Sequence, residues 1–174
     1  TMRRLVREMM EQGAYLDELL SWDIELFLQS SQLHDVGKIS IHDNILLKPD
    51  KLTDGEFEEM KKHAIFGEEI IDRIQKNTQE NAFLTHAKIM AGSHHEKWDG
   101  SGYPRGATGK DIPLQGRIMA IADVYDALVS KRPYKEPFSH DKAMQIMRES
   151  RGTHFDPVIL DVFVTAFDHM GRSA

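Results

Sequence analysis

Histidine and aspartate side chains with the chemistry of metal ligands recur along the chain, in two adjacent pairs and at two single positions. Imidazole and carboxylate without thiolate suit iron, manganese, zinc or nickel better than calcium or magnesium. Most of these residues continue apolar helical stripes, where an unpaired carboxylate costs several kcal/mol unless a cation compensates it. The set exceeds what one tetrahedral ion binds, so it favours two ions bridged by a carboxylate, an arrangement that hydrolyses phosphoesters. The six candidate ligands are His34, Asp35, His63, His94, His95 and Asp123.

A structural interpretation competes with metal binding at each position taken alone. An isolated His-Asp pair is frequent by chance, and a single core histidine is usually only hydrogen-bonded. Four groups of ligand-type residues on four helix faces make joint metal binding the better hypothesis. The other histidines are expected to be solvated, to pack or to shape turns; they are His42, His86, His140, His154 and His169.

Helical periodicity runs from end to end, and no segment alternates as a strand does. A T-x-x-E capping box predicts a helix that begins at Asp54, and Asp156-Pro157 predicts the start of the last helix. The glycine-rich segment 98–110 is predicted to be a loop. The other predicted helices lie at 2–10, at 21–37, around 65–74, at 81–95, at 114–130 and at 139–150. The sequence therefore predicts one all-α domain of about seven helices.

The amino-acid composition argues against several classes of protein. The chain has 174 residues, a net charge of −6 and no cysteine. The absence of cysteine excludes disulfides and thiolate zinc sites and is compatible with a reducing, cytoplasmic location. The acidic balance argues against binding a nucleic acid polymer. No apolar run approaches the roughly 20 residues of a membrane span.

Several segments together resemble the HD-GYP family, a branch of the HD metal-dependent phosphohydrolases that degrades the bacterial second messenger cyclic di-GMP. The most specific of them reads H-H-E-x-W-D-G-x-G-Y-P and covers His94–Pro104. The remaining matches are Leu33–Ile39, Ile45–Pro49, Met60–His63, Arg117–Leu128, Arg132–Lys135 and Gly152–Pro157. The resemblance implies an HD-domain helical bundle and a metal-dependent cyclic di-GMP phosphodiesterase.

The resemblance also implies a role for each matching residue. The six candidate ligands would bind two or three iron or manganese ions, with Asp35 bridging two of them. Asp35 and Lys38 would be catalytic, because Lys38 would face the scissile phosphate and offset its negative charge. Arg132 and Lys135 match positions that contact the dinucleotide, although ordinary surface charge is the alternative interpretation. The products would be linear pGpG, GMP or both.

Partners are implied in the same way. The loop motif Gly102, Tyr103 and Pro104 would reach a ligand or a partner such as a diguanylate cyclase domain. The family usually carries a sensor or receiver domain at its N-terminus, and we expect one in the full-length protein.

One departure from the family pattern concerns the N-terminal segment. Family members carry a further metal-binding histidine on the helix before the His-Asp pair, and residues 2–10 resemble the continuation of that helix without a histidine. We therefore expect 1–174 to be an HD-GYP domain that is truncated inside its first metal-binding helix and has low activity.

Two other functions remain open at this stage. The chain could be a non-catalytic receptor or adaptor that binds cyclic di-GMP or a diguanylate cyclase, and the six intact candidate ligands argue for the enzyme instead. It could also hydrolyse another phosphoester, such as a different cyclic dinucleotide. The Gly102-Tyr103-Pro104 segment argues against that alternative.

Overall fold

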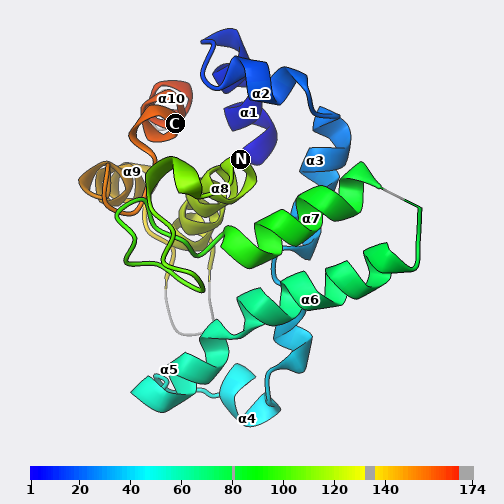
Figure 1. The fold of residues 1–174 in the computed structure, drawn as a ribbon. Coiled ribbons are helices and arrows are strands. Elements are labelled where there is room, and N and C mark those ends of the chain that lie inside the picture. The colour runs from blue at the N-terminus through cyan, green and yellow to red at the C-terminus, as the bar shows by residue number, and fades with distance from the viewer. Residues whose placement is uncertain (80, 132–135, 169–174) are drawn as a thin grey trace.

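The computed structural model describes residues 1–79, 81–131 and 136–168, and every regular element in these ranges is a helix (Figure 1). Within the same ranges, β pairing is limited to one isolated bridge between Arg151 and Phe155. The predicted all-α class is therefore confirmed.

The first half of the chain contains five α-helices and two 3₁₀ segments. They are α1 (Met2–Glu11), α2 (Leu16–Leu20), α3 (Ile24–Ser30), η1 (Ser31–Leu33), η2 (Val36–Ser40), α4 (Asp43–Leu46) and α5 (Asp54–Lys61). The described part of the second half contains α6 (His63–Lys76), α7 (Ala82–Ser93), η3 (Gly109–Asp111), α8 (Leu114–Val129), α9 (His140–Glu149) and α10 (Pro157–Phe167).

Side-chain caps fix the starts of the helices that sequence signals predicted. Thr53 and Glu56 form the complete capping box at α5. Ser139 accepts a hydrogen bond from Lys142 N at the start of α9. Asp156 accepts from Val158 N at 2.8 Å, and α10 begins at the proline that follows it. Each cap satisfies backbone N–H groups that have no partner inside the helix.

The prediction of one helix over 21–37 is wrong. The α-helix ends at Ser30, and the chain continues through η1, a turn at Asp35 and η2. The hydroxyls of Ser30 and Ser31 donate to the carbonyls of Phe27 and Leu28, both at 2.7 Å. Such local bonds compete with the α-helical ladder, and this competition explains the change to the tighter 3₁₀ form.

Two glycines allow η2 to lie directly against α6. A Cβ on Gly37 would lie 1.9 Å from the carbonyl oxygen of His63 and 2.4 Å from the amide nitrogen of Gly67. No residue with a side chain fits there without moving backbone. The contact sets the turn at Asp35 beside the start of α6.

Two clusters of buried apolar side chains stabilise the bundle. The larger one joins α1, α2, α3, α7, α8, α9 and α10 and includes the fully buried rings of Phe27, Phe155 and Phe163. The smaller one consists of Ile71 from α6 with Ala87 and Ala91 from α7, and Leu33, Val36 and Leu84 pack against it. Helices α6 and α7 run side by side in opposite directions (Figure 1). Helix α7 therefore contributes to both clusters.

A buried ion pair joins α8 to α10. Arg117 donates to the Asp156 carboxylate at 2.8 Å, and both side chains are at most 6% exposed. The Tyr15 hydroxyl donates to the same carboxylate oxygen at 2.7 Å. The Arg117 guanidinium also lies over the Tyr15 ring, 4.7 Å from its centroid. These contacts fix the helix that carries Asp123.

Candidate metal centre

The six predicted ligands come from four parts of the fold and lie close together. His34 and Asp35 lie in the turn between η1 and η2, and His63 is the first residue of α6. His94 and His95 directly follow α7, and Asp123 lies on α8. Helices α7 and α8 lie close together at Ser93 and Gly116, which are both small residues. A Cβ on Gly116 would lie 2.3 Å from the Ser93 hydroxyl.

Three histidines are oriented by hydrogen bonds to nearby backbone carbonyls. Nδ1 of His34 lies 2.7 Å from the Ser31 carbonyl, and Nδ1 of His63 lies 2.7 Å from the Met60 carbonyl. Nδ1 of His94 lies 2.9 Å from the Met90 carbonyl. A carbonyl accepts, so Nδ1 carries the proton and the lone pair of the neutral ring lies on Nε2. Metal-binding histidines are commonly oriented in this way.

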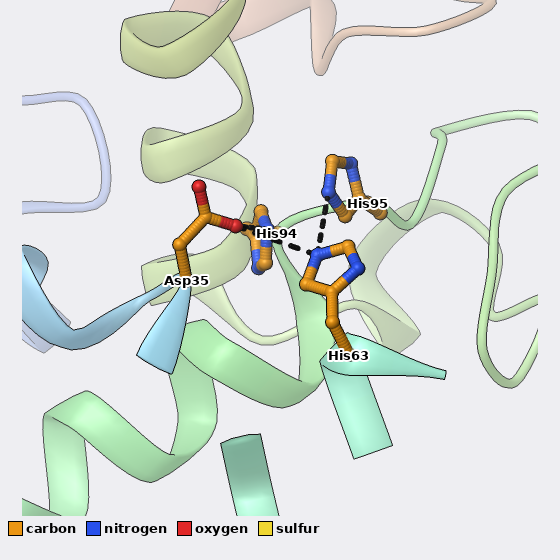
Figure 2. A group of neighbouring side chains, drawn as sticks. All are labelled: Asp35, His63, His94 and His95. Carbon is orange, nitrogen blue, oxygen red and sulfur yellow. Dashed lines mark hydrogen bonds and ion pairs between the residues drawn. The ribbon is translucent and has the colours of Figure 1, made fainter. Parts of the chain in front are cut away.

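A four-donor group, formed by Asp35, His63, His94 and His95, offers ligand atoms that all lie within 4.8 Å of one another (Figure 2). Nε2 of His63 lies 3.1 Å from Nε2 of His95 and 3.4 Å from Oδ1 of Asp35. Nε2 of His94 lies 3.7 Å from the same Oδ1. The donor atoms therefore converge from four sides on a common point.

Two atoms of this group indicate that the group fits a cation. Oδ1 of Asp35 and Nε2 of His94 are buried and have no hydrogen-bond partner. A buried polar atom without a partner costs about 1–3 kcal/mol, and more when it is charged. A divalent ion would satisfy both lone pairs at once, and imidazole with carboxylate is a normal donor set for zinc, iron or manganese.

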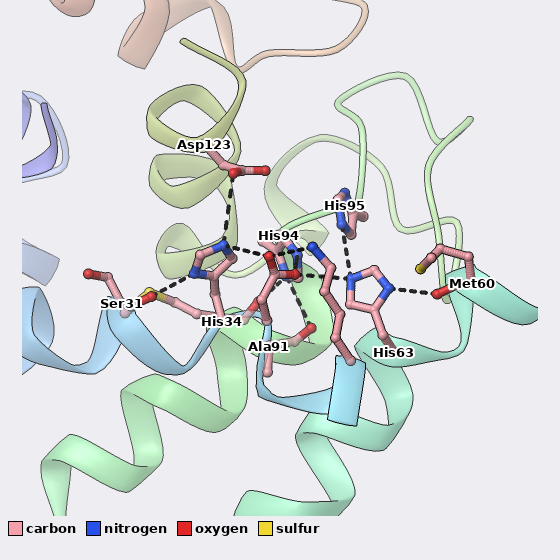
Figure 3. A network of polar contacts seen from close by, with 11 residues as sticks. Ser31, His34, Met60, His63, Ala91, His94, His95 and Asp123 are labelled. Carbon is pink, nitrogen blue, oxygen red and sulfur yellow. Dashed lines mark hydrogen bonds and ion pairs between the residues drawn. The ribbon is translucent and has the colours of Figure 1, made fainter. Parts of the chain in front are cut away.

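A three-donor group shares Asp35 and extends toward α8. Nε2 of His34 lies 3.4 Å from Oδ2 of Asp35 and 3.8 Å from Oδ1 of Asp123 (Figure 3). Asp35 therefore directs one oxygen toward each group. Its Oδ2 also accepts a hydrogen bond from the ammonium group of Lys38 at 2.6 Å.

The electrostatics of the centre favour an anionic Asp35 beside neutral His63 and His95 imidazoles. Burial alone would raise the pKa of Asp35, but the close approach of His34 and His94 and the hydrogen bond from Lys38 hold that pKa far below its usual range. Burial lowers the pKa of His95 to about 2, and the neighbouring imidazoles lower it further in the same direction. Burial also lowers the pKa of His63. Neutral imidazole is the form that binds metals.

The Gly102-Tyr103-Pro104 loop packs against the centre. The Tyr103 ring stacks on the His95 ring with centroids 4.8 Å apart and planes 25° apart, and the Tyr103 N–H donates to the His95 carbonyl. A Cβ on Gly102 would lie 2.3 Å from the Lys97 nitrogen. Burial raises the pKa of the Tyr103 phenol. The predicted loop motif therefore forms part of the wall of the centre.

One residue that fixes this loop was missed by the sequence analysis. Glu96 is 3% exposed, and its two carboxylate oxygens accept hydrogen bonds from the backbone of Arg105 at 2.7 Å and of Ala107 at 3.0 Å. The Arg105 side chain forms an ion pair with Glu68 and donates to the Gly92 carbonyl. Glu96 is the third residue of the motif over His94–Pro104, but that motif did not indicate that its carboxylate would be buried and bind the backbone of the loop.

The predicted dinucleotide contacts Arg132 and Lys135 lie outside the described residues. Two of the other histidines, His86 and His140, have packing or hydrogen-bonding roles, and His169 lies outside the described residues. The His86 ring contacts the rings of Trp22 and Phe27, and His140 lies within hydrogen-bond distance of the Tyr125 hydroxyl.

An HD domain model matches residues 1–159. The chain therefore belongs to the HD domain family, the helical class that the fold and the His-Asp centre define. Within that family it belongs to the HD-GYP branch, on the evidence of its relatives and of the motif over His94–Pro104. No helix in the described residues combines the length and apolarity of a membrane span.

The relatives are bacterial phosphodiesterases. The chain is 50% identical over 151 residues to a probable cyclic di-GMP phosphodiesterase of Vibrio cholerae, with 86% of the chain and 34% of the relative covered. It is 52% identical over 141 residues to a cyclic di-GMP phosphodiesterase of the same organism, with 81% and 29% covered. A 3′3′-cGAMP-specific phosphodiesterase 2 from V. cholerae is 42% identical over 158 residues, with 91% and 29% covered. The chain thus spans about a third of the length of these relatives.

A solved structure supports the fold. A cyclic GMP-AMP specific phosphodiesterase of V. cholerae superposes with a TM-score of 0.56 at 19% identity, covering 96% of this chain and 43% of that one. At this identity the likeness concerns the fold alone.

Proposed function

We propose that residues 1–174 form an HD-GYP domain that hydrolyses cyclic di-GMP in bacterial second-messenger signalling. The observation that carries the proposal is the four-donor group, whose unpartnered Asp35 oxygen and His94 nitrogen are buried beside each other. The relatives named cyclic di-GMP phosphodiesterases support the substrate. Cytoplasmic location, as for a soluble signalling enzyme, is part of the same proposal.

The two donor groups suit two ions that share Asp35. The four-donor group would hold one ion, and His34, Asp35 and Asp123 would hold the second with fewer protein ligands. We propose iron or manganese, because the donors are imidazole and carboxylate without sulfur. Bound divalent ions supply a Lewis acid for the phosphoryl oxygens and lower the pKa of water. The four-donor group should bind its ion first, because it offers one more ligand.

The protein side chains around the centre have distinct roles in this proposal. Asp35 would hold both ions, and it stays ionised because its pKa lies far below its usual range. Lys38 lies 2.6 Å from Asp35 and would offset negative charge that develops on the phosphate. Arg132 and Lys135 would contact the dinucleotide. Tyr103 packs on His95 and limits the positions of that ring.

Hydrolysis is tested with purified protein loaded with Mn²⁺ or Fe²⁺ and incubated with cyclic di-GMP. Chromatography of the nucleotides should show loss of the substrate and formation of linear pGpG, GMP or both. The matched control is Asp35→Asn, which keeps the size of the side chain and removes its charge. Binding of cyclic di-GMP without any product in the loaded protein would instead indicate the non-catalytic receptor.

A second substrate has support from the comparisons. Relatives named 3′3′-cGAMP-specific phosphodiesterases match 91% and 74% of this chain at 42% and 43% identity. Comparing kcat/KM for cyclic di-GMP and 3′3′-cGAMP on the same preparation decides between the two substrates. We expect the higher value for cyclic di-GMP.

Two partner domains are proposed for the full-length protein. One relative is named a cyclic di-GMP phosphodiesterase response regulator, from Xanthomonas campestris, at 44% identity over 142 residues. We propose that the full-length protein likewise carries an N-terminal sensor or receiver domain. We also propose that the Gly102-Tyr103-Pro104 loop contacts a diguanylate cyclase domain.

A further inference from the structure

An aromatic and cationic shelf, formed by Phe57, Lys61 and Tyr103, lies beside the metal centre. The rings of Phe57 and Tyr103 meet edge to face, with centroids 6.4 Å apart and planes 84° apart. The ammonium nitrogen of Lys61 lies 5.5 Å from the Phe57 centroid and 5.6 Å from the Tyr103 centroid. Phe57 and Lys61 are four residues apart on α5, so they share one face of that helix.

The shelf is connected to the centre on both of its sides. Tyr103 stacks directly on His95, with ring centroids 4.8 Å apart. Helix α5 ends at Lys61, and the second residue after it is His63. A ligand that is held at the four-donor group therefore has this shelf as a neighbouring surface.

Packing within the fold explains only part of the position of Phe57. Helix α5 contains no buried residue, and the Phe57 side chain is 48% exposed. A large ring left half in water gains only about half of the free energy that full burial would give, and a ligand that covers it would add the rest. The exposed ring lies beside the candidate catalytic centre, which distinguishes it from a scattered surface side chain.

Lys61 is available to interact with a ligand. Its ammonium group lies 2.6 Å from the Glu58 carboxylate, but the Glu58 side chain is 67% exposed. The Lys61 side chain is 25% exposed, so only the Glu58 end of the pair lies mainly in water. An ion pair with such an exposed partner contributes little, and a ligand oxygen can replace Glu58 at small cost. An ammonium beside aromatic rings suits a flat ligand that carries carbonyl or phosphate oxygens.

We propose that this shelf is a purine subsite, in which Phe57 stacks on one base of the cyclic dinucleotide and Lys61 pairs with an oxygen of the same nucleotide. The inference rests on the proposed function for the identity of the ligand. Phe57 and Lys61 are binding residues in it, and neither takes part in the hydrolysis itself.

Equilibrium binding tests the subsite separately from turnover. Isothermal titration of a hydrolysis-resistant phosphorothioate analogue of cyclic di-GMP into the Mn²⁺-loaded protein should give a Kd that rises roughly tenfold in Phe57→Ala, because loss of an aromatic stacking partner has about this effect. A rise is also expected in Lys61→Ala. Inhibition by inorganic phosphate, which reaches the centre without a base, should be the same in both variants and in the parent protein.

Two matched controls separate the shelf from general surface effects. Ile74→Ala removes an apolar side chain with the same 48% exposure on α6, and Glu58→Ala removes the ion-pair partner while leaving Lys61 in place. Neither should weaken the binding of cyclic di-GMP. An unchanged Kd in Phe57→Ala and Lys61→Ala, or an equal loss of phosphate inhibition, overturns the subsite.

The same titration separates the two proposals. If the parent protein binds cyclic di-GMP through the shelf and forms no product, the hydrolytic function fails and the subsite holds. If hydrolysis proceeds with unchanged Kd in both variants, the function holds and the subsite fails. If the loaded protein neither binds nor hydrolyses cyclic di-GMP, both proposals fail.

Discussion

Replacing Gly37 with alanine should separate the Asp35 turn from α6. The new Cβ would lie 1.9 Å from the His63 carbonyl oxygen, so the backbones must move apart by about 1.5 Å to reach an ordinary contact of 3.4 Å. The two nearest atoms, the His63 carbonyl oxygen and the Gly67 amide nitrogen, both belong to the backbone and cannot rotate away. Overpacking of this kind costs about 1–3 kcal/mol, and we expect the upper end of that range. The melting temperature should then fall by about 6–12 °C.

The same displacement should weaken metal binding. Oδ1 of Asp35 lies 3.4 Å from Nε2 of His63, and metal ligands tolerate errors of only about 0.2 Å in distance. The control is Gly55→Ala, because nothing lies within 4 Å of a Cβ at that position of α5. Thermal unfolding and Mn²⁺ titration of the two variants check the prediction. A Gly37→Ala protein that melts and binds Mn²⁺ as the parent does would refute the role given to this contact.

Three further predictions concern single side chains. Asp35→Ala should lose both metal and activity, whereas Lys38→Ala should keep its metal content and turn over about 10²-fold more slowly. Elemental analysis checks this, and an equal loss of metal in both variants would show that Lys38 has a structural role. Glu96→Gln should raise the KM for the dinucleotide and speed proteolysis within the 103–107 loop. The reason is that the amide NH₂ is a donor and would face one of the two backbone N–H donors, so that one hydrogen bond is lost. An unchanged KM and cleavage pattern would contradict this. Burial lowers the pKa of His154 to about 4, below an unfolded value of about 6.5, so its stabilising contribution is complete above pH 6.5 and is lost as the pH falls toward 4. The urea midpoint of His154→Gln should therefore change less between pH 7 and pH 5 than that of the parent, and parallel curves would refute the assignment.

Local signals predicted much of the fold because they act over a few residues. The capping box at Thr53 and the Asp156-Pro157 pair set helix starts through contacts within three residues. The helix break after Ser30 was not predictable from apolar periodicity. It depends on hydroxyls that compete with the backbone and on the approach of Gly37 to Gly67, 30 positions along the chain.

The candidate site was predictable for a different physical reason. Imidazole and carboxylate groups on apolar helix faces need polar partners or a cation. His63, His94 and Asp35 were therefore expected to interact with such groups, and in the structure they lie next to one another. Their roles as ligands stay predictions. Glu96 and Phe57 could not be identified in this way, because one becomes buried and the other stays half-exposed only through tertiary placement.

The smaller apolar cluster, between α6 and α7, affects how easily α6 opens locally. In the described chain its buried members are Ile71, Ala87 and Ala91, a much smaller set than the cluster around α8. Local opening of α6 should therefore need less free energy than global unfolding, and its amides should exchange with deuterium before those of α8. A cation held by His63 together with residues outside α6 would close that opening, adding about 2.7 kcal/mol when its concentration is a hundred times the Kd. Metal supply in the cell would then set how often this half of the domain opens.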